Sequence, residues 1–318
     1  MSIAQYIKEI GRGGAGARSL GADQAEDLMS QVLDGRVTDL EIGAFALAMR
    51  MKGESVEEIT GFLAAAQDRC ETIPTQRPVV LLPSYNGARR LPNLTALLAL
   101  RLAQEGAQVL VHGPGHDPAR VTTAEVFHDL GLSAARNAHE VEQAWLRREP
   151  AFMRTDMLCP PLARLLDVRW VVGVRNSGHT IAKMLNPCRG ARALRVVNHT
   201  HPEFGELMAA YAQRASADML LLRGTEGEPV ADPRRAPRLQ VVLAGQPRTD
   251  LSMAAQDGVL TELPVLPRGH DAATTALYIQ SVIGGEKPMP APLEQQVQTL
   301  LRALAAMAHH TEGLGLTA

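Results

Sequence analysis

The chain has 318 residues, of which 46% are hydrophobic and 21% are charged, so it is long enough to bury one large core or two smaller ones. Its formal net charge of −2 excludes a polycation, and an aromatic content of 3% argues against a base-stacking platform for single-stranded nucleic acid. The three cysteines, Cys70, Cys159 and Cys188, are odd in number and far apart, which argues against a disulfide framework and for a reducing compartment.

The first 70 residues predict helices only. Three start signals each place a short side-chain acceptor three residues before a glutamate, which is the spacing of a capping box. The pairs are Asp23 with Glu26, Thr38 with Glu41, and Ser55 with Glu58. Apolar residues at helical spacing follow each pair, so we expect a small helical bundle.

The N-terminal stretch MSIAQYIKEIGRGG has no long apolar core. No apolar run elsewhere approaches the ~18 residues of a membrane-spanning helix. We therefore expect no signal peptide, no contact with a membrane and a cytoplasmic protein.

Beyond the bundle the pattern changes. Pro74–Pro78 (PTQRP) predicts a linker between domains. Short apolar runs then alternate with helical patterns, which is typical of an α/β domain with a mostly parallel central sheet. The expected strands are Val79–Leu82, Ala107–Gly113, Trp170–Val174, Leu194–Asn198, Met219–Gly224 and Leu239–Gly245, and a long helix is expected over Leu293–His310.

Positive charge is concentrated in the middle of the chain. Residues 151–250 carry 14 Lys or Arg against 9 Asp or Glu, and residues 175–195 carry five Lys or Arg and no acidic residue. A solvated surface helix usually mixes both signs. Arg89 and Arg90 follow a predicted strand in LLPSYNGARRLPNL, where ligands of α/β sheets gather. These cations are either solvated surface residues or phosphate contacts, and the candidates for contact are Arg89, Arg90, Arg175, Lys183, Arg189, Arg192 and Arg195.

Two stretches carry a resemblance to a known family. GRVTDLEIGAFALAMRMKGESVEEITGFLAAA, residues 35–66, resembles the helical domain of the anthranilate phosphoribosyltransferases. GVRNSGHTIAKMLNP, residues 173–187, resembles a motif of the same family and aligns with it without gaps. The resemblance implies the fold shared with pyrimidine nucleoside phosphorylases: a helical domain over residues 1–75, joined by helices from about 158 to 190, and an α/β domain over residues 76–318.

The chain departs from this family where the family holds phosphoribosyl diphosphate. The family's glycine-rich diphosphate loop is replaced by PSYNGARR, whose one glycine is Gly87. Glycines let backbone N–H groups approach phosphate closely, so the side chains of this loop would crowd a diphosphate. The magnesium-binding acidic pair of the family falls at about Pro229 and Val230, with Glu226 and Glu228 nearby. We therefore expect no metal site and no cofactor, with magnesium only if the chain is a transferase.

The resemblance also implies a degenerate small-ligand cleft. Its residues are Tyr85, Asn86, Gly87, His112, Gly113, Thr122, Asn176 and His179. Arg175 is at the position of the family's arginine for the aromatic acid, and His179 replaces an asparagine. His112 and His179 fit structural histidines better than general bases, and no catalytic residue is assigned.

Two functions remain open. The departures fit a subgroup that resembles the transferases but binds nucleic acid, and this resemblance implies a homodimer, paired through its helical domain, whose basic grooves contact DNA or RNA backbones without reading sequence. The alternative is a phosphoribosyl- or glycosyltransferase of unknown acceptor, in which arginines replace the metal at the phosphate site. Affinity that falls steeply with salt favours the first, and saturable binding of phosphoribosyl diphosphate favours the second.

Overall fold

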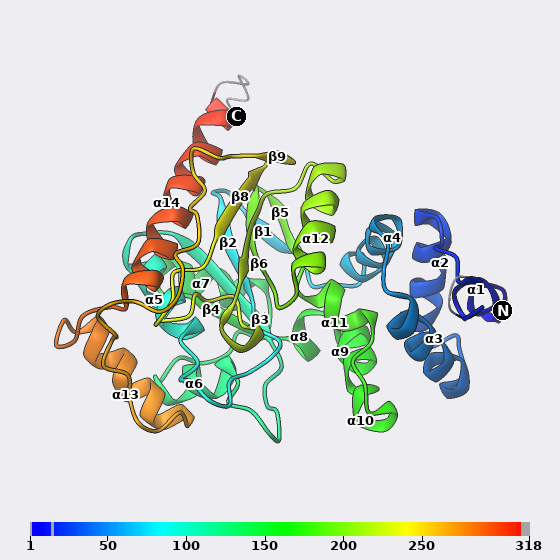
Figure 1. Cartoon of the computed structure of the whole chain (residues 1–318), viewed down its shortest axis with the longest axis horizontal. Helices are drawn as coiled ribbons and strands as arrows, with labels where there is room; N and C mark the ends of the chain where they lie inside the picture. Colours follow the sequence, from blue (N-terminus) through cyan, green and yellow to red (C-terminus); the bar gives the residue numbers. More distant parts are fainter. Residues whose placement is uncertain (1, 14–15, 313–318) are drawn as a thin grey trace. The chain divides into compact units, whose positions relative to one another are not determined.

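The computed structural model describes residues 2–13 and 16–312, which form two compact units (Figure 1). The helical unit comprises the chain up to Glu71 and the segment Thr155–Pro187. The α/β unit comprises Thr72–Arg154 and the chain from Cys188 onwards. The chain therefore leaves the α/β unit at Arg154 and returns to it at Cys188, whereas the resemblance implies borders at 75 and at about 158 and 190.

The helical unit consists of short helices, as the pattern of the first 70 residues predicts. They are α1 (Ala4–Ile10), α2 (Ala22–Leu33), α3 (Asp39–Lys52), α4 (Val56–Gln67), α8 (Thr155–Leu158), α9 (Pro160–Asp167), α10 (Arg169–Val172) and α11 (Ser177–Ala182). The capping boxes at Thr38 and Ser55 are confirmed. The predicted helix start at Asp23 is wrong, because α2 begins at Ala22 with Gly21 as its N-cap residue. The N–H of Gly21 donates to the side chain of Gln24.

Helices α2 and α4 pack closely where Gly61 faces α2. A side chain at this position would place its Cβ 2.2 Å from the carbonyl oxygen of Ala22, so only glycine fits. Phe45 and Phe62 are fully buried and meet edge to face, with ring centroids 5.9 Å apart. These contacts give the helical unit a core of its own.

The predicted strand Trp170–Val174 is wrong, because this segment forms α10. The helix ends at Gly173, whose φ of +80° is the left-handed conformation that glycine adopts readily at helix ends. Trp170 and Val171 are 55% and 89% exposed, whereas a central strand would bury them. A short apolar run alone does not distinguish a strand from a helix.

Within the described residues the α/β unit is built on a seven-stranded sheet in the order β4-β3-β2-β6-β7-β8-β9. Neighbouring strands from β4 to β7 in this order run parallel, and the β7–β8 and β8–β9 pairs are antiparallel, which confirms the predicted mostly parallel sheet. The strands are β2 (Val79–Pro83), β3 (Gln108–Gly113), β4 (Ala151–Arg154), β6 (Ala193–His199), β7 (Met219–Arg223), β8 (Leu239–Leu243) and β9 (Gln246–Pro247).

Part of the predicted linker Pro74–Pro78 is a strand. Ile73–Thr75 forms β1, which pairs in parallel with β5 (Cys188–Gly190) in a separate two-stranded sheet. Pro74 has no backbone N–H group to donate, and an edge strand tolerates this loss, so the motif can form a short strand. The two segments at which the chain enters the α/β unit, first at Thr72 and again at Cys188, are therefore paired with each other.

Helices cover both faces of the main sheet (Figure 1). They are α5 (Thr95–Gln104), α6 (Thr123–Asp129), α7 (Ala138–Leu146), α12 (Pro202–Arg214), α13 (Ala272–Ile283) and α14 (Ala291–Glu312), and a 3₁₀ turn, η2, spans Thr225–Gly227. None of the helices in the described part of the chain is long and apolar enough to cross a membrane. Because β2, β3, β6 and β7 run parallel, the loops after their carboxyl ends meet at one edge of the sheet.

Candidate anion-binding site

The loop after β2 directs its backbone N–H groups at the chain's own carboxylates. Oε1 of Glu228 accepts the N–H of Asn86 at 2.7 Å and that of Gly87 at 2.6 Å. Its Oε2 accepts the hydroxyls of Ser84 and, at 3.4 Å, of Thr95. Glu228 is only 1% exposed, so this carboxylate is held as a buried anion by donors from the loop and from α5.

A second carboxylate completes the arrangement. Oε2 of Glu226 accepts the N–H of Arg89 at 2.6 Å, and both of its oxygens lie within 3.2 Å of the N–H of Arg90. The amide of Asn86 also donates to the carbonyl oxygen of Glu226. The loop 84–90 therefore binds oxyanions, but the oxyanions come from residues 226 and 228.

This arrangement does not fit a magnesium–diphosphate site. Magnesium requires near-octahedral oxygen ligands at about 2.0–2.1 Å, and acidic side chains usually supply them. Glu226 and Glu228 are turned toward N–H and hydroxyl donors of the loop, and Pro229 and Val230 have no side-chain oxygen. The donors of this loop are thus bonded to carboxylates, and a diphosphate would need the same donors.

Tyr85 and His112 form a buried pair beneath the loop. The tyrosine hydroxyl and Nδ1 of His112 are 2.9 Å apart, and neither ring is more than 4% exposed. Burial lowers the pKa of His112 to about 3, so the ring is neutral at physiological pH. The pair supports the floor of the loop, which fits the structural interpretation of His112.

We expect His112 to make the protein less stable as the pH falls from 6.5 toward 3. The folded-state pKa of about 3 lies below the value of ~6.5 expected in the unfolded chain, so the unfolded chain takes up this proton first. Linkage sets an upper limit of about 1.4 kcal/mol per pH unit on the loss. Chemical denaturation at pH 6.5 and pH 5 should show a smaller loss for His112→Gln than for the unsubstituted protein. Equal losses would contradict the buried, neutral assignment.

Three further predicted cleft residues, Gly87, Gly113 and Thr122, shape the backbone around the loop. Gly87 has φ +68° and a Cβ there would lie 2.8 Å from Cβ of Arg120, whereas a Cβ on Gly113 would lie 1.9 Å from the Ser84 carbonyl oxygen. Thr122 caps α6 through a capping box. These residues fix the shapes of the loops and present no side-chain group to a ligand.

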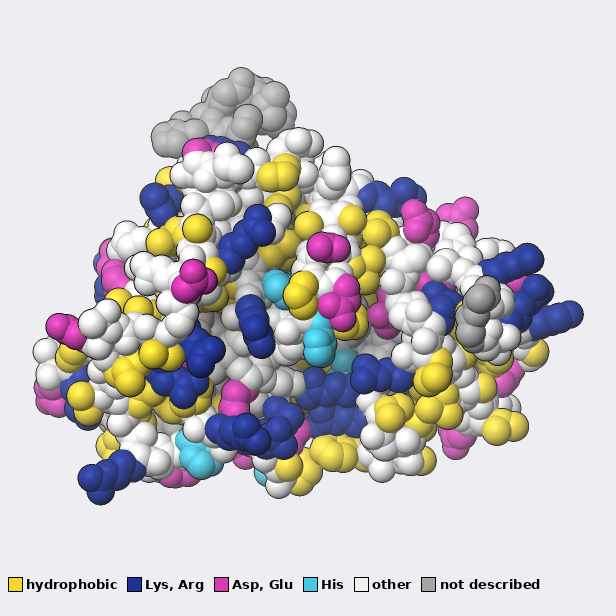
Figure 2. Space-filling model, viewed as in Figure 1, with side chains coloured by type: hydrophobic (Ala, Val, Ile, Leu, Met, Phe, Trp, Pro, Cys, Tyr) yellow, Lys and Arg dark blue, Asp and Glu magenta, His cyan; other side chains and the backbone are white. Residues whose placement is uncertain are grey.

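A cavity of about 1010 Å³ opens beside the loop in the α/β unit. Its lining comes from the ends of β6 and β7, from α12 and from the segment 232–258. The charged lining residues are Arg90, Arg223, Arg234, Arg235, Arg238, Glu206, Glu226, Asp232 and Asp257. We call this space the arginine cavity. Figure 2 shows Lys and Arg side chains close together on this face of the α/β unit.

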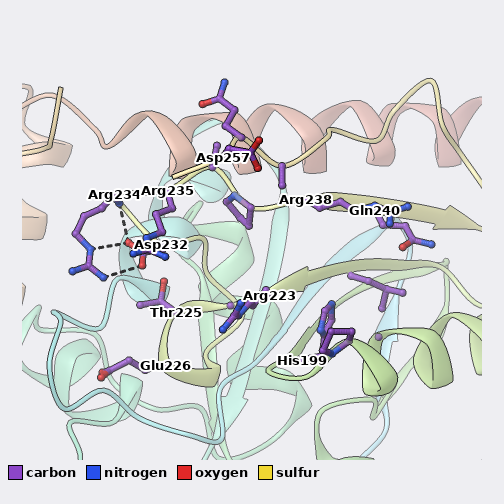
Figure 3. A pocket seen from close by; sticks show the side chains of 18 of the residues that line it. His199, Arg223, Thr225, Glu226, Asp232, Arg234, Arg235, Arg238, Gln240 and Asp257 are labelled. Atoms are coloured by element: carbon purple, nitrogen blue, oxygen red, sulfur yellow. Dashed lines mark hydrogen bonds and ion pairs between the residues drawn. The ribbon is translucent and has the colours of Figure 1, made fainter. Parts of the chain in front are cut away.

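Internal pairing leaves the arginine cavity cationic. Asp232 is paired with Arg234 at 3.0 Å, as the dashed lines in Figure 3 show, and Glu226 is occupied by the loop. Among the described residues, the structure shows no ion pair for the side chains of Arg90, Arg223, Arg235 and Arg238. Of the acidic lining residues, Glu206 and Asp257 remain to offset these four guanidinium groups.

The predicted phosphate contacts in the α/β unit separate into two groups. Arg89, Arg90 and Arg189 are exposed. Arg192 instead pairs with Asp218, with Nε 2.8 Å from Oδ2. Arg195 is only 6% exposed, because it belongs to β6, which is buried on both faces. Its guanidinium carbon lies 5.8 Å from the ring centroid of Tyr211. The positions of Arg192 and Arg195 do not suit contact with a polymer in solvent.

The other predicted residues belong to the helical unit. Asn176 caps α11, where its Oδ1 accepts the N–H of Gly178 at 2.9 Å and its amide donates to the carbonyl of Leu165. His179 is 7% exposed, and burial together with the nearby charge of Arg175 lowers its pKa to about 3. Arg175 and Lys183, the residue that caps the other end of α11, are half-buried.

Sequence reasoning missed most of the arginine cavity. Arg223, Arg235 and Arg238 were not selected, although the sequence DPRRAPR, residues 232–238, carries three arginines in five positions. The excess of basic residues over 151–250 was the available signal. The segment lacks strand and helix patterns, so nothing in it indicated that it lines a cavity with the end of β7.

Three comparisons relate the chain to known proteins. Residues 4–70 match the helical bundle domain of a glycosyl transferase family. The chain is 38% identical to the uncharacterized protein YbiB of Escherichia coli (strain K12), over 99% of this chain and 98% of that protein. It is 25% identical to the anthranilate phosphoribosyltransferase of Thermobifida fusca (strain YX), over 91% of this chain and 82% of that protein.

Solved structures agree in fold. The anthranilate phosphoribosyltransferase of Thermus thermophilus aligns with a TM-score of 0.69 and 21% identity, over 92% of this chain and 85% of that chain. The Saccharomyces cerevisiae enzyme in complex with PRPP and Mg aligns with a TM-score of 0.69 and 12% identity, over 96% of this chain and 88% of that chain. At these identities the structural similarity establishes the fold alone.

Proposed function

The chain belongs to the anthranilate phosphoribosyltransferase-like family, and from this premise we propose that it binds nucleic acid as a homodimer and holds the polymer by its phosphates. The observation that carries the proposal is the arginine cavity. Four guanidinium groups without ion pairs among the described residues lie where ligands of a parallel sheet gather. Guanidinium groups suit phosphate because their N–H donors match its oxygens in pairs.

The proposed contacts in the α/β unit are Arg89, Arg90, Arg189, Arg223, Arg235 and Arg238, and those in the helical unit are Arg175 and Lys183. Contacts of this kind fix the backbone of the polymer without distinguishing bases, so we expect little sequence preference. The low aromatic content of 3% supports contact through the phosphates, because binding by base stacking would need exposed rings. The cysteines form no disulfide, which supports a cytoplasmic location.

The transferase alternative receives no support from the loop geometry. Relatives named anthranilate phosphoribosyltransferase include an enzyme solved with PRPP and Mg. In this chain four N–H groups of loop 84–90, those of Asn86, Gly87, Arg89 and Arg90, are bonded to Glu226 and Glu228. A diphosphate would have to displace both carboxylates before it could bind there.

Calorimetric titration tests the proposed function. Single-stranded and double-stranded DNA and RNA of mixed sequence should bind at low salt, with similar affinities among sequences of the same type. Phosphoribosyl diphosphate at millimolar concentration, with and without magnesium, should give no saturable heat. Saturable binding of that ligand without binding of any polymer would overturn the proposal in favour of the transferase.

The homodimer part of the proposal is supported by an apolar stripe on α3. Leu40, Leu47 and Met51 are 84%, 48% and 86% exposed. Their spacings of seven and four residues place them on one side of the helix. Large exposed apolar side chains in a row are typical of surfaces that associate, and identical patches on two copies satisfy a two-fold dimer.

We expect Leu40→Glu combined with Met51→Glu to convert the dimer into a monomer. Two carboxylates in each copy would then face each other across an apolar interface, where unpaired charge is costly. Light scattering measures the mass, and circular dichroism checks that the helices remain. Leu146→Glu is the matched control, because Leu146 is also exposed, at 70%, but lies in the α/β unit. A wild-type monomer, or a variant that stays dimeric, would contradict this interface.

A further inference from the structure

We propose that Glu226 and Glu228 are built-in anions that occupy a phosphate-binding loop, and that removal of Glu228 opens this loop to free inorganic phosphate. The N–H groups of Asn86, Gly87, Arg89 and Arg90 all donate to these two carboxylates. A run of backbone N–H groups that converge on oxyanions is the arrangement by which loops bind phosphate. The chain thus carries its own competitor for that site.

The Glu228 half is the more completely formed. Its carboxylate accepts two backbone N–H groups and the hydroxyls of Ser84 and Thr95. The Ser84 hydroxyl is itself positioned by Oγ1 of Thr123 at 2.7 Å. An oxygen of phosphate accepts the same donors as an oxygen of carboxylate, so this group of donors suits either anion.

The turn 224–228 has a backbone shaped to deliver the carboxylates. A Cβ on Gly224 would lie 1.8 Å from the carbonyl oxygen of Glu228, and a Cβ on Gly227 would lie 2.5 Å from Nδ2 of Asn86. Glu226 has φ +50°, a left-handed conformation that costs a non-glycine residue about 1–2 kcal/mol. The hydrogen bonds from the loop offset this cost, which connects the strained backbone to the bound carboxylate.

The same contacts set the directions of two cationic side chains. Glu226 holds the main-chain N–H groups of Arg89 and Arg90 together. Arg90 lines the arginine cavity, whereas Arg89 lines a second cavity of about 890 Å³ that also contains Arg120. Glu226 is therefore a positioning residue for the two arginines, in addition to filling the loop.

The experiment measures binding of inorganic phosphate to Glu228→Ala by equilibrium dialysis, with thermal unfolding in phosphate and in chloride at equal ionic strength. We expect the variant to bind phosphate at least tenfold more tightly than the wild type, and its melting temperature to rise with phosphate concentration as ligand linkage requires. Phosphate binding by the wild type measures any phosphate held in the arginine cavity and gives the baseline for the variant. Glu125→Ala is the matched control, since Glu125 accepts the N–H of Thr122 alone among backbone groups and its removal opens no comparable site.

Two outcomes would overturn the proposal: a folded Glu228→Ala protein that binds phosphate no better than the wild type, or equal stabilisation of the Glu125→Ala control. If Glu228→Ala fails to fold, Glu226→Ala provides the same test at the half-exposed end of the loop, where two N–H groups are released. Phosphate binding no stronger than in the wild type would then count against the inference. The result is independent of polymer binding, which is measured separately on the same proteins.

Discussion

Replacement of Arg223, Arg235 and Arg238 together by glutamine is expected to weaken nucleic-acid binding by at least about three orders of magnitude. These three arginines line the cavity without ion pairs among the described residues, so each is available for a phosphate. A hydrogen bond to a charged group contributes about 1.5–3 kcal/mol, and a factor of ten corresponds to about 1.4 kcal/mol. Glutamine keeps much of the side-chain length and polarity, which limits damage to the fold.

The control for this variant changes the same net charge elsewhere. Arg136, Arg147 and Arg302 are exposed arginines of the α/β unit that do not line the arginine cavity. Their joint replacement by glutamine alters the overall field equally, so a comparable loss of affinity would show that binding follows net charge and not the cavity. Fluorescence anisotropy with one labelled oligonucleotide compares all three proteins at a single salt concentration.

Glu228→Ala is expected to lower the free energy of unfolding by about 3–5 kcal/mol in phosphate-free buffer. The substitution removes the acceptor for two backbone N–H groups and two hydroxyls, and a buried donor left without a partner costs about 1–3 kcal/mol. Without the carboxylate the hydroxyls can turn to other acceptors, such as Oγ1 of Thr123 at 2.7 Å from Oγ of Ser84, so the costs do not simply add.

Chemical denaturation measures this loss, and Glu228→Gln separates charge from shape. Glutamine retains one acceptor oxygen but places an amide NH₂ among N–H and hydroxyl donors, so we expect an intermediate loss. A loss below about 1 kcal/mol for Glu228→Ala, which is ordinary for a surface substitution, would contradict the buried-anion description of the loop.

The fold was largely predictable because its signals are local. Thr38 and Ser55 carry complete capping boxes, and Val79–Leu82 is a short apolar run between turn residues, so each element could be identified from a few neighbours. Trp170–Val174 shows the limit of such patterns. Its apolar residues suit a strand equally well, and only the left-handed Gly173 and the exposure of Val171 identify the helix.

The candidate site was predictable only in part because it depends on distant pairs. The loss of the glycine-rich loop and of the acidic pair could be read from the sequence. The bonds from Asn86 to Glu228 and from Arg89 to Glu226 join residues separated by 142 and 137 positions, and no local pattern indicates them. Arg195 was selected for its charge, although it belongs to a strand that is buried on both faces.

The dependence of polymer affinity on salt tests the central claim most directly. Each phosphate neutralised by an arginine contributes about 0.7–0.9 to the slope of log affinity against log salt concentration. We expect a steep negative slope for the wild type, and a slope reduced by about two to three for the Arg223, Arg235 and Arg238 variant. A wild-type affinity that is flat across salt, or an unchanged slope in the variant, would contradict a polymer held by the guanidinium groups of the arginine cavity.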